Sequence, residues 1–491
     1  MNTMAQKLMV ATAVLAYASL SVFAQATQPA APAGASAKEG IAVTVYNGNF
    51  GVVREVRAID IGPDGQVRFQ EVPTAIDPTT VHFASLTDPS AVLLEQNYQY
   101  DLVSADKLLQ KYIDKEITVV AGAQGGVTTN YAGVLQSFDG EHLVLKTAEG
   151  IIMVRRPDNV RDIRFSSLPQ GLMTKPTLVW LVNTAKPGKQ LAEVTYQTGG
   201  LTWHAEYVLL LKGNDSQADL AGWVSVQNNS GKTYTDAKLK FIAGEVQKVQ
   251  PMMEMLQQKA AVTYDMPVAA QMVEKAFFEY HMYSLPRPST VADNEVKQLE
   301  MFTPAKDIKV SKWYLYKPLR NFRWDIRSRF EDPGYGATSD KDVFVFIDFK
   351  NDKASNLGIP LPGGVVRVYK ADPADNSTEF VGEERIEHTP KDENLSLRVG
   401  TAFDIKGERK QTDFRKVSDR VMRESIQIKL RNHKDEKVVV RVIEPMYRYT
   451  NWEMLQSSQE YKKLESHEVA WDVPVDANGE TTVTYSVEYS W

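Results

Sequence analysis

The feature that most constrains the fold is a succession of short runs in which apolar and polar residues alternate, from about residue 41 to the last residue. In the tail, residues 482–491, every second residue is apolar up to the final Trp491. Alternation with a period of two is typical of strands that bury one face. Gly, Pro, Asn and Asp between the runs are typical of turns. The sequence therefore predicts a mostly β protein made of several sandwich domains.

Residues 343–347 are apolar on both faces, which predicts a strand in the middle of its sheet. One helix is predicted after Ser104, which can cap it, with an apolar face made by Leu108, Leu109, Tyr112 and Ile113. The other predicted strands outside the segment 116–167 are residues 42–46, 52–57, 67–69, 178–182, 191–196, 207–211, 220–227, 238–243, 425–430 and 438–442.

The segment 116–167 reads as a small domain of its own. Five short strands are predicted in about 50 residues, with Asp139-Gly140 and Glu149-Gly150 as tight turns. This number and spacing of strands is typical of an SH3-like or Sm-like barrel. The predicted strands are residues 117–120, 131–137, 143–147, 151–154 and 160–165.

The mature chain that would follow cleavage of the signal is long enough for two to four domains. Helical spacing of Met252, Met253 and Met255, and again around residues 268–276, predicts a helical linker between two sandwich regions. The expected organisation is a signal peptide (1–26), a flexible linker (27–39), an N-terminal β region with a short helix (40–115), the small barrel (116–167), a β-sandwich region (176–250), the Met-rich helical linker (251–279) and a C-terminal β-sandwich region (280–491).

The first residues have the three parts of a secretory signal peptide. Lys7 is the only charge in the first 26 residues, and an apolar run follows over residues 8–23. Ala24-Gln25-Ala26 is a small-x-small cleavage pattern, so we expect cleavage after Ala26. The alternative is an uncleaved anchor, although the run is shorter than the roughly 20 apolar residues of a spanning helix. No later run approaches a membrane helix, because charged residues interrupt each one.

The chain has no cysteine, which excludes disulfides, thiolate metal sites and a lipid-modified cysteine after the signal. An exported protein without disulfides must be stabilised by burial of its core, and 43% hydrophobic residues supply the material. The net charge of −6 without basic blocks excludes the usual basic surface of nucleic-acid-binding proteins. The expected location is the periplasm or cell envelope.

Several segments occur together in the order of a known family. They are residues 45–57, 94–98, 199–207, 229–231, 239–244, 361–369, 388–393 and 431–434. With these segments the chain resembles bacterial exported proteins of the domain of unknown function 4139 family, and more distantly mucoidy inhibitor proteins. The resemblance implies β-sandwich proteins of the Gram-negative envelope. It implies no activity, cofactor or catalytic set.

A methionine-rich region is the first candidate site. Its methionines are Met252, Met253, Met255, Met266, Met272, Met282 and Met301, with His281 beside Met282, and thioethers are ligands that suit Cu(I). The alternative is that these methionines fill gaps in apolar packing. The seven histidines of the chain lack the paired spacing of a zinc site, so no cofactor is expected.

The segment 388–393 is the densest polar motif. His388, Asp392 and Glu393 offer a possible general acid and base. Carboxylates at adjacent strand positions point to opposite faces, which favours the alternative of a hydrogen-bonded turn. In the segment 203–207, Trp203 and Tyr207 share one strand face while His204 and Glu206 share the other. The aromatic side chains could form a surface that stacks on sugars. The alternative is that they are core residues and that the polar pair is solvated.

The leading functional hypothesis is an envelope protein that binds or scaffolds a protein or a surface polysaccharide without catalysis. The first alternative is a periplasmic glycan-active enzyme that uses carboxylates such as Asp392 and Glu393. The second alternative is an outer-membrane-associated component, because the alternating tail ends in an aromatic residue as outer-membrane sorting signals do.

Overall fold

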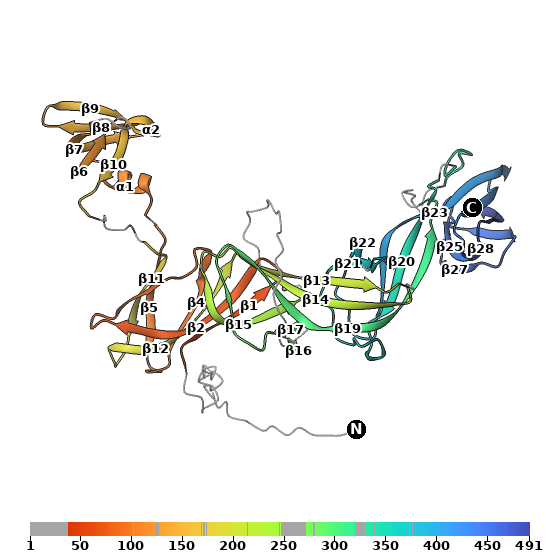
Figure 1. Ribbon diagram of the computed structural model, residues 1–491, viewed down its shortest axis with the longest axis horizontal. Coiled ribbons are helices and arrows are strands. Elements are labelled where there is room, and N and C mark those ends of the chain that lie inside the picture. The colour runs from red at the N-terminus through yellow and green to blue at the C-terminus, as the bar shows by residue number, and fades with distance from the viewer. Residues whose placement is uncertain are drawn as a thin grey trace, which may run out of the picture. The chain divides into compact units, whose positions relative to one another are not determined.

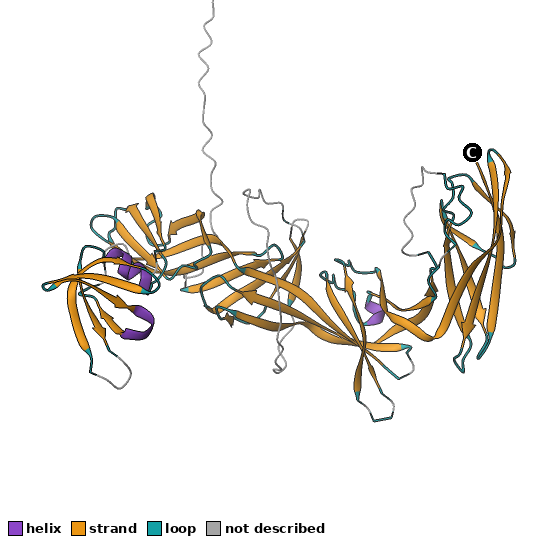
Figure 2. Cartoon of the chain, turned by 90° about the horizontal axis from the view of Figure 1, so that it is seen from above, coloured by secondary structure: helices purple, strands orange, loops and turns teal. Residues whose placement is uncertain are grey.

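The computed structural model describes residues 38–101, 103–122, 127–167, 169, 172, 174–213, 215–244, 246, 272–277, 280–319, 329–337, 339–372, 374–375 and 377–491. The predicted signal peptide lies outside these residues, as do Met252, Met253 and Met255. The described chain is mostly β, as predicted, and Figure 2 shows strands along its whole course. Among the described residues, no helix is both long enough and apolar enough to cross a membrane.

An eight-stranded sheet begins the fold (Figure 1). Its strands are β1 (Gly40–Tyr46), β2 (Phe50–Ile61), β4 (Ile76–Ser85), β12 (Gly188–Gly199), β15 (Tyr234–Ala243), β16 (Val273–Phe277), β17 (Tyr280–Ser284) and β18 (Ser289–Val291). The order is β16-β17-β15-β1-β2-β12-β4, with β18 paired to β15. A smaller sheet contains β3 (Gln66–Gln70), β11 (Thr177–Asn183) and β5 (Val92–Gln99), in that order.

A five-stranded unit is inserted between β5 and β11. It consists of α1 (Ala105–Lys111), β6 (Glu116–Ala121), β7 (Thr129–Phe138), β8 (His142–Thr147), β9 (Gly150–Arg155), α2 (Arg156–Asn159) and β10 (Val160–Arg164). The order is β10-β6-β7-β8-β9, all antiparallel. The five predicted strands are confirmed to within two residues, and Ser104 caps α1 through its side chain as predicted.

A thirteen-stranded sheet carries the rest of the chain. Its strands are β13 (Leu201–Leu211), β14 (Gln217–Asn228), β19 (Glu295–Tyr316), β20 (Asp342–Lys350), β21 (Gly364–Ala371), β22 (Thr378–Ile386), β23 (Asn394–Ser418), β24 (Val421–Asn432), β25 (Val438–Pro445), β26 (Trp452–Ser457), β27 (Lys462–Glu465), β28 (Glu468–Val475) and β29 (Glu480–Ser490), with a 3-10 turn η1 (Lys353–Ser355) after β20. The main order is β22-β21-β13-β14-β19-β20-β23-β24-β29-β26, while β25, β27 and β28 branch from β19. Strand β20 lies between β19 and β23, so the predicted central strand at 343–347 is confirmed.

Three hydrophobic cores support these sheets. The first contains Trp180, Trp203 and residues of the N-terminal sheets, the second contains Trp471 and the C-terminal strands, and the third belongs to the inserted unit. Three strands, β19, β20 and β23, give residues to both the first and second cores. Strands of the segments 176–250 and 280–491 therefore share one sheet and one core.

The helical linker predicted for residues 251–279 is wrong where the structure describes it. Val273–Phe277 is the strand β16, which pairs with β17 from Val273 opposite Ser284 to Phe277 opposite Tyr280. Helical spacing of a few apolar residues is a local signal, whereas a neighbouring strand satisfies the backbone polar groups. Pairing with β17 therefore decides the conformation.

Candidate functional site

The strand β13 separates the residues of the predicted aromatic motif by face. Trp203 and Tyr207 are buried in the first core, where the Trp203 indole donates to the carbonyl of Ile242 and the Tyr207 hydroxyl to that of Pro362. These two aromatics are core residues, one of the two predicted alternatives. His204 and Glu206 point to the opposite face, because successive side chains of a strand alternate.

Glu206 is held by three side chains from three strands. His204 Nε2 lies 3.2 Å from Glu206 Oε1, and Gln298 Nε2 on β19 donates to Oε2 at 2.7 Å. Arg367 Nη1 on β21 lies 3.7 Å from Oε1. The hydrogen bond with His204 contributes most to a pKa of Glu206 below its usual value, and the positive charge of Arg367 adds to it against the effect of burial. Glu206 is thus an ionised, oriented acceptor.

An aromatic ring lies directly beside this carboxylate. Trp223 on β14 is the cross-strand partner of Glu206 on one side and of Glu300 on the other, and it is partly exposed. Directly opposite residues of antiparallel strands have their side chains on the same face, about 5 Å apart. We call His204, Glu206, Trp223, Gln298 and Arg367 the β13 outer face. It combines a fixed carboxylate, a guanidinium, an amide and an indole on adjacent strands.

The predicted acid and base residues occupy a turn. His388 Nδ1 accepts from the Gly363 backbone N–H at 3.0 Å. The backbone N–H of Asp392 donates to the carbonyl of Asn351 at 2.7 Å, and the carbonyl of Glu393 accepts from the N–H of Asn351 at 2.8 Å. All three predicted side chains are exposed. These are the contacts of a hydrogen-bonded turn, the second of the two interpretations given above.

The methionine candidates separate. Met272 and Met301 are buried in the first core, which is the packing role. Met282 lies on β17 beside His281, whose Nδ1 is 2.8 Å from Glu274 Oε1. Within the described residues, no group of three or more His, Asp or Glu side chains has the arrangement of a metal site.

A cluster of buried charges escaped the sequence analysis. Arg409 Nε donates to both carboxylate oxygens of Glu444 at 3.0 Å, and the Tyr485 hydroxyl donates to Oε2 at 2.9 Å. Nearby, Glu424 accepts from Arg448 Nε at 3.0 Å and from the Tyr447 hydroxyl at 2.6 Å. The four charged side chains are at most 1% exposed.

Because solvent does not reach this cluster, its role is structural. Buried charges are stable only when they are paired and hydrogen-bonded. Arg448 also donates to the carbonyls of Asp332 at 2.8 Å and Tyr335 at 3.0 Å, and so fixes the segment before β20. The available signal was a charge in register with apolar residues: Glu424 falls on the same face of β24 as buried Met422 and Ile426.

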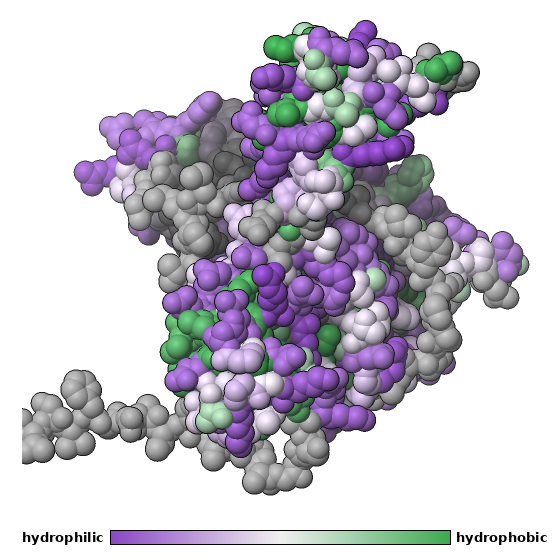
Figure 3. All heavy atoms as spheres, turned by 90° about the vertical axis from the view of Figure 1, so that its left-hand side faces the viewer, coloured by the Kyte–Doolittle hydropathy of each residue, from purple (hydrophilic) through white to green (hydrophobic). Residues whose placement is uncertain are grey.

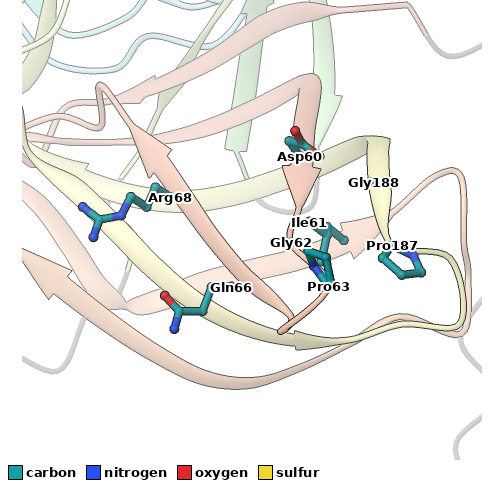
Figure 4. A pocket seen from close by; sticks show the side chains of 8 residues that line it. All are labelled: Asp60, Ile61, Gly62, Pro63, Gln66, Arg68, Pro187 and Gly188. Carbon is teal, nitrogen blue, oxygen red and sulfur yellow. The ribbon is translucent and has the colours of Figure 1, made fainter.

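A surface hollow of about 590 Å³ lies at the ends of β2 and β12. Its polar lining is Asp60, Gln66 and Arg68, and Figure 4 shows that these three side chains do not point toward one another. The remaining lining residues are Ile61, Gly62, Pro63, Pro187 and Gly188. The hollow therefore lacks convergent chemistry, and the β13 outer face remains the stronger candidate.

The chain matches the model of a known protein family. Residues 192–491 match the model of the family described as Domain of unknown function (DUF4139). The matched range contains every residue of the β13 outer face and the buried charge cluster. Among curated proteins, none matches the chain.

Proposed function

We propose that this chain, which belongs to the family described as Domain of unknown function (DUF4139), is an exported protein of the cell envelope that binds a surface polysaccharide without converting it. Export rests on the signal-peptide pattern of residues 1–26. Binding rests on the β13 outer face, and the observation that carries it is the partly exposed Trp223 beside the oriented carboxylate of Glu206.

Sugar chemistry fits this surface. A pyranose ring has an apolar C–H face that stacks on an aromatic side chain, and its hydroxyls donate to carboxylates. Glu206 is already oriented by its neighbours, so little ordering is needed when a hydroxyl approaches. A polysaccharide extends over many residues, and adjacent strands of a sheet face offer it a surface rather than a closed pocket.

Catalysis by Glu206 is disfavoured by its surroundings. A general acid in glycoside hydrolysis needs a raised pKa, so that the carboxyl carries a proton at working pH. The pKa of Glu206 is lowered, and both of its oxygens have partners in the chain. The arrangement supports recognition more than proton transfer.

The test is binding of the mature chain, from residue 27, to polysaccharide extracted from the envelope of the producing cells. Trp223→Ala should weaken binding at least tenfold in affinity electrophoresis, because the stacking surface is removed. Phe403→Ala is the matched control, since Phe403 is an aromatic side chain that is 89% exposed and belongs to β23.

Two outcomes would overturn the proposal. Equal binding by wild type and Trp223→Ala would remove the β13 outer face from the site. Release of new reducing ends by the wild-type protein would favour the glycan-active enzyme instead.

A further inference from the structure

The inserted unit has the features of an independent recognition module. The strands before and after it, β5 and β11, pair with each other, with Gln99 opposite Thr177. A short hairpin turn would be sufficient to connect these two strands, and the unit takes the place of that turn. Its hydrophobic core contains only residues between 109 and 165. An insertion with its own core is not needed to complete the sandwich around it, which suggests a separate role.

One edge of this unit is open. Strand β9 is the last strand of the sheet, and within the described residues it pairs with β8 alone. The outer edge of such a strand carries backbone N–H and C=O groups that can accept another strand. Proteins usually protect edges with proline, bulges or inward-pointing charges. Strand β9 reads GIIMVR and pairs with β8 in continuous register, without proline or bulge.

The outer face of β9 is apolar. Ile151 is 72% exposed and Met153 is 67% exposed. The cross-strand neighbour of Met153 is Val144 on β8, which is partly exposed on the same face. Figure 3 shows green, apolar side chains on this unit at the top of the view. Outer faces of antiparallel sheets are usually polar, so these side chains indicate a surface that another protein covers.

We propose that this surface binds a second copy of the chain, by antiparallel pairing of β9 with β9 about a twofold axis at Ile152. In this register Ile151 lies opposite Met153 of the partner subunit, and each copy makes the same contact. Glu149, in the turn that precedes β9, then comes close to Arg155 of the partner subunit. Apolar residues face apolar residues, and opposite charges face each other.

Neighbouring registers lack this match. An axis at Ile151 places Glu149 opposite Met153 of the partner subunit, and an axis at Met153 places Ile151 opposite Arg155 of the partner subunit. Both would bury a charge against an apolar side chain, which is unfavourable without a partner. The sequence of β9 and its flanks is thus self-complementary about one residue, which is the reason to choose a second copy as the occupant.

The absence of cysteine allows a direct test. In the mature chain, Ile152→Cys places one thiol on the proposed axis, opposite the same thiol of the other copy. Opposite residues of antiparallel strands have Cα atoms about 4.5–5.5 Å apart, within the range of a disulfide. Mild oxidation should convert most of this variant into a covalent dimer on a non-reducing gel. Val127→Cys, in the same unit and 93% exposed, should remain mostly single.

Charge exchange tests the register. Wild type should sediment with twice the mass of one chain, and Met153→Lys should sediment as a single chain with unchanged circular dichroism. Glu149→Arg should weaken the dimer at least tenfold, and adding Arg155→Glu to it should restore the dimer. A wild type that sediments as one chain at 100 μM would overturn the proposal. Equal cross-linking by both cysteine variants, or no rescue by the double exchange, would overturn the register.

Discussion

At Glu424 and Glu444, carboxylates occupy positions that strand alternation assigns to the core. The fold accommodates them through Arg448 and Arg409, and through the hydroxyls of two tyrosines. Removing one member of such a pair leaves its partner buried without a counter-charge. The free energy lost in this way is larger than the net free energy that the intact pair contributes. The surface pair Arg441–Asp472 on β25 and β28 has the same chemistry but remains in contact with water.

This difference predicts unequal effects of the same substitution. Arg448→Met should lower the free energy of unfolding by about 3–5 kcal/mol, because Glu424 stays buried. Arg441→Met should lower it by about 1 kcal/mol or less, because solvent screens an exposed pair. Urea unfolding of the C-terminal strands, followed by tryptophan fluorescence, measures both. Equal losses would mean that the buried cluster is no more important than a surface ion pair.

The pairing of elements explains features that local pattern does not. Strand β21 runs parallel to β13, and Gly364 lies opposite Ala205. A Cβ at Gly364 would lie 2.2 Å from the carbonyl oxygen of Ala205, so only glycine permits this approach of two backbones. No strand was predicted over β21, and no local pattern identifies β13 as its partner.

Gly364→Ala is therefore expected to force β21 away from β13. The cost should be about 1–3 kcal/mol, as in other overpacked sites. Gly140→Ala is the control, because a Cβ there meets no atom within 4 Å. Thermal unfolding monitored by circular dichroism compares the two. A Gly364→Ala protein as stable as the control would show that the two strands separate without cost.

For the whole molecule, the proposed dimer would place two polysaccharide surfaces in one particle. Two linked sites bind a long polymer more tightly than one site, because the second contact is intramolecular. The contact through β9 uses no residue of the β13 outer face, so the two proposals are separable by mutation.

Met153→Lys should therefore weaken binding to long polysaccharide about 10- to 100-fold. Its affinity for short oligosaccharide fragments of the same polymer should equal that of wild type. A biosensor carrying immobilised polymer, with fragments as soluble competitors, distinguishes the two. Equal losses for polymer and fragments would indicate that Met153 acts on the sugar site itself.

The sequence by itself determined the mostly β class, the positions of most strands and the capped helix α1. Those properties depend on alternation, turn residues and a capping side chain, which act over a few residues. The five strands of the inserted unit were predictable for the same reason. The two faces of the segment 203–207 could also be separated by alternation alone.

Only the tertiary structure decided which strands are neighbours, and with them the candidate sites. Glu206 meets Gln298 and Arg367 because β14 places β19 two strands from β13, while β21 adds to its other side. The strand β16 replaced a predicted helix because β17 was available to pair with it. Pairing between segments far apart in the chain depends on closing long loops and on shared burial, and no local pattern encodes these.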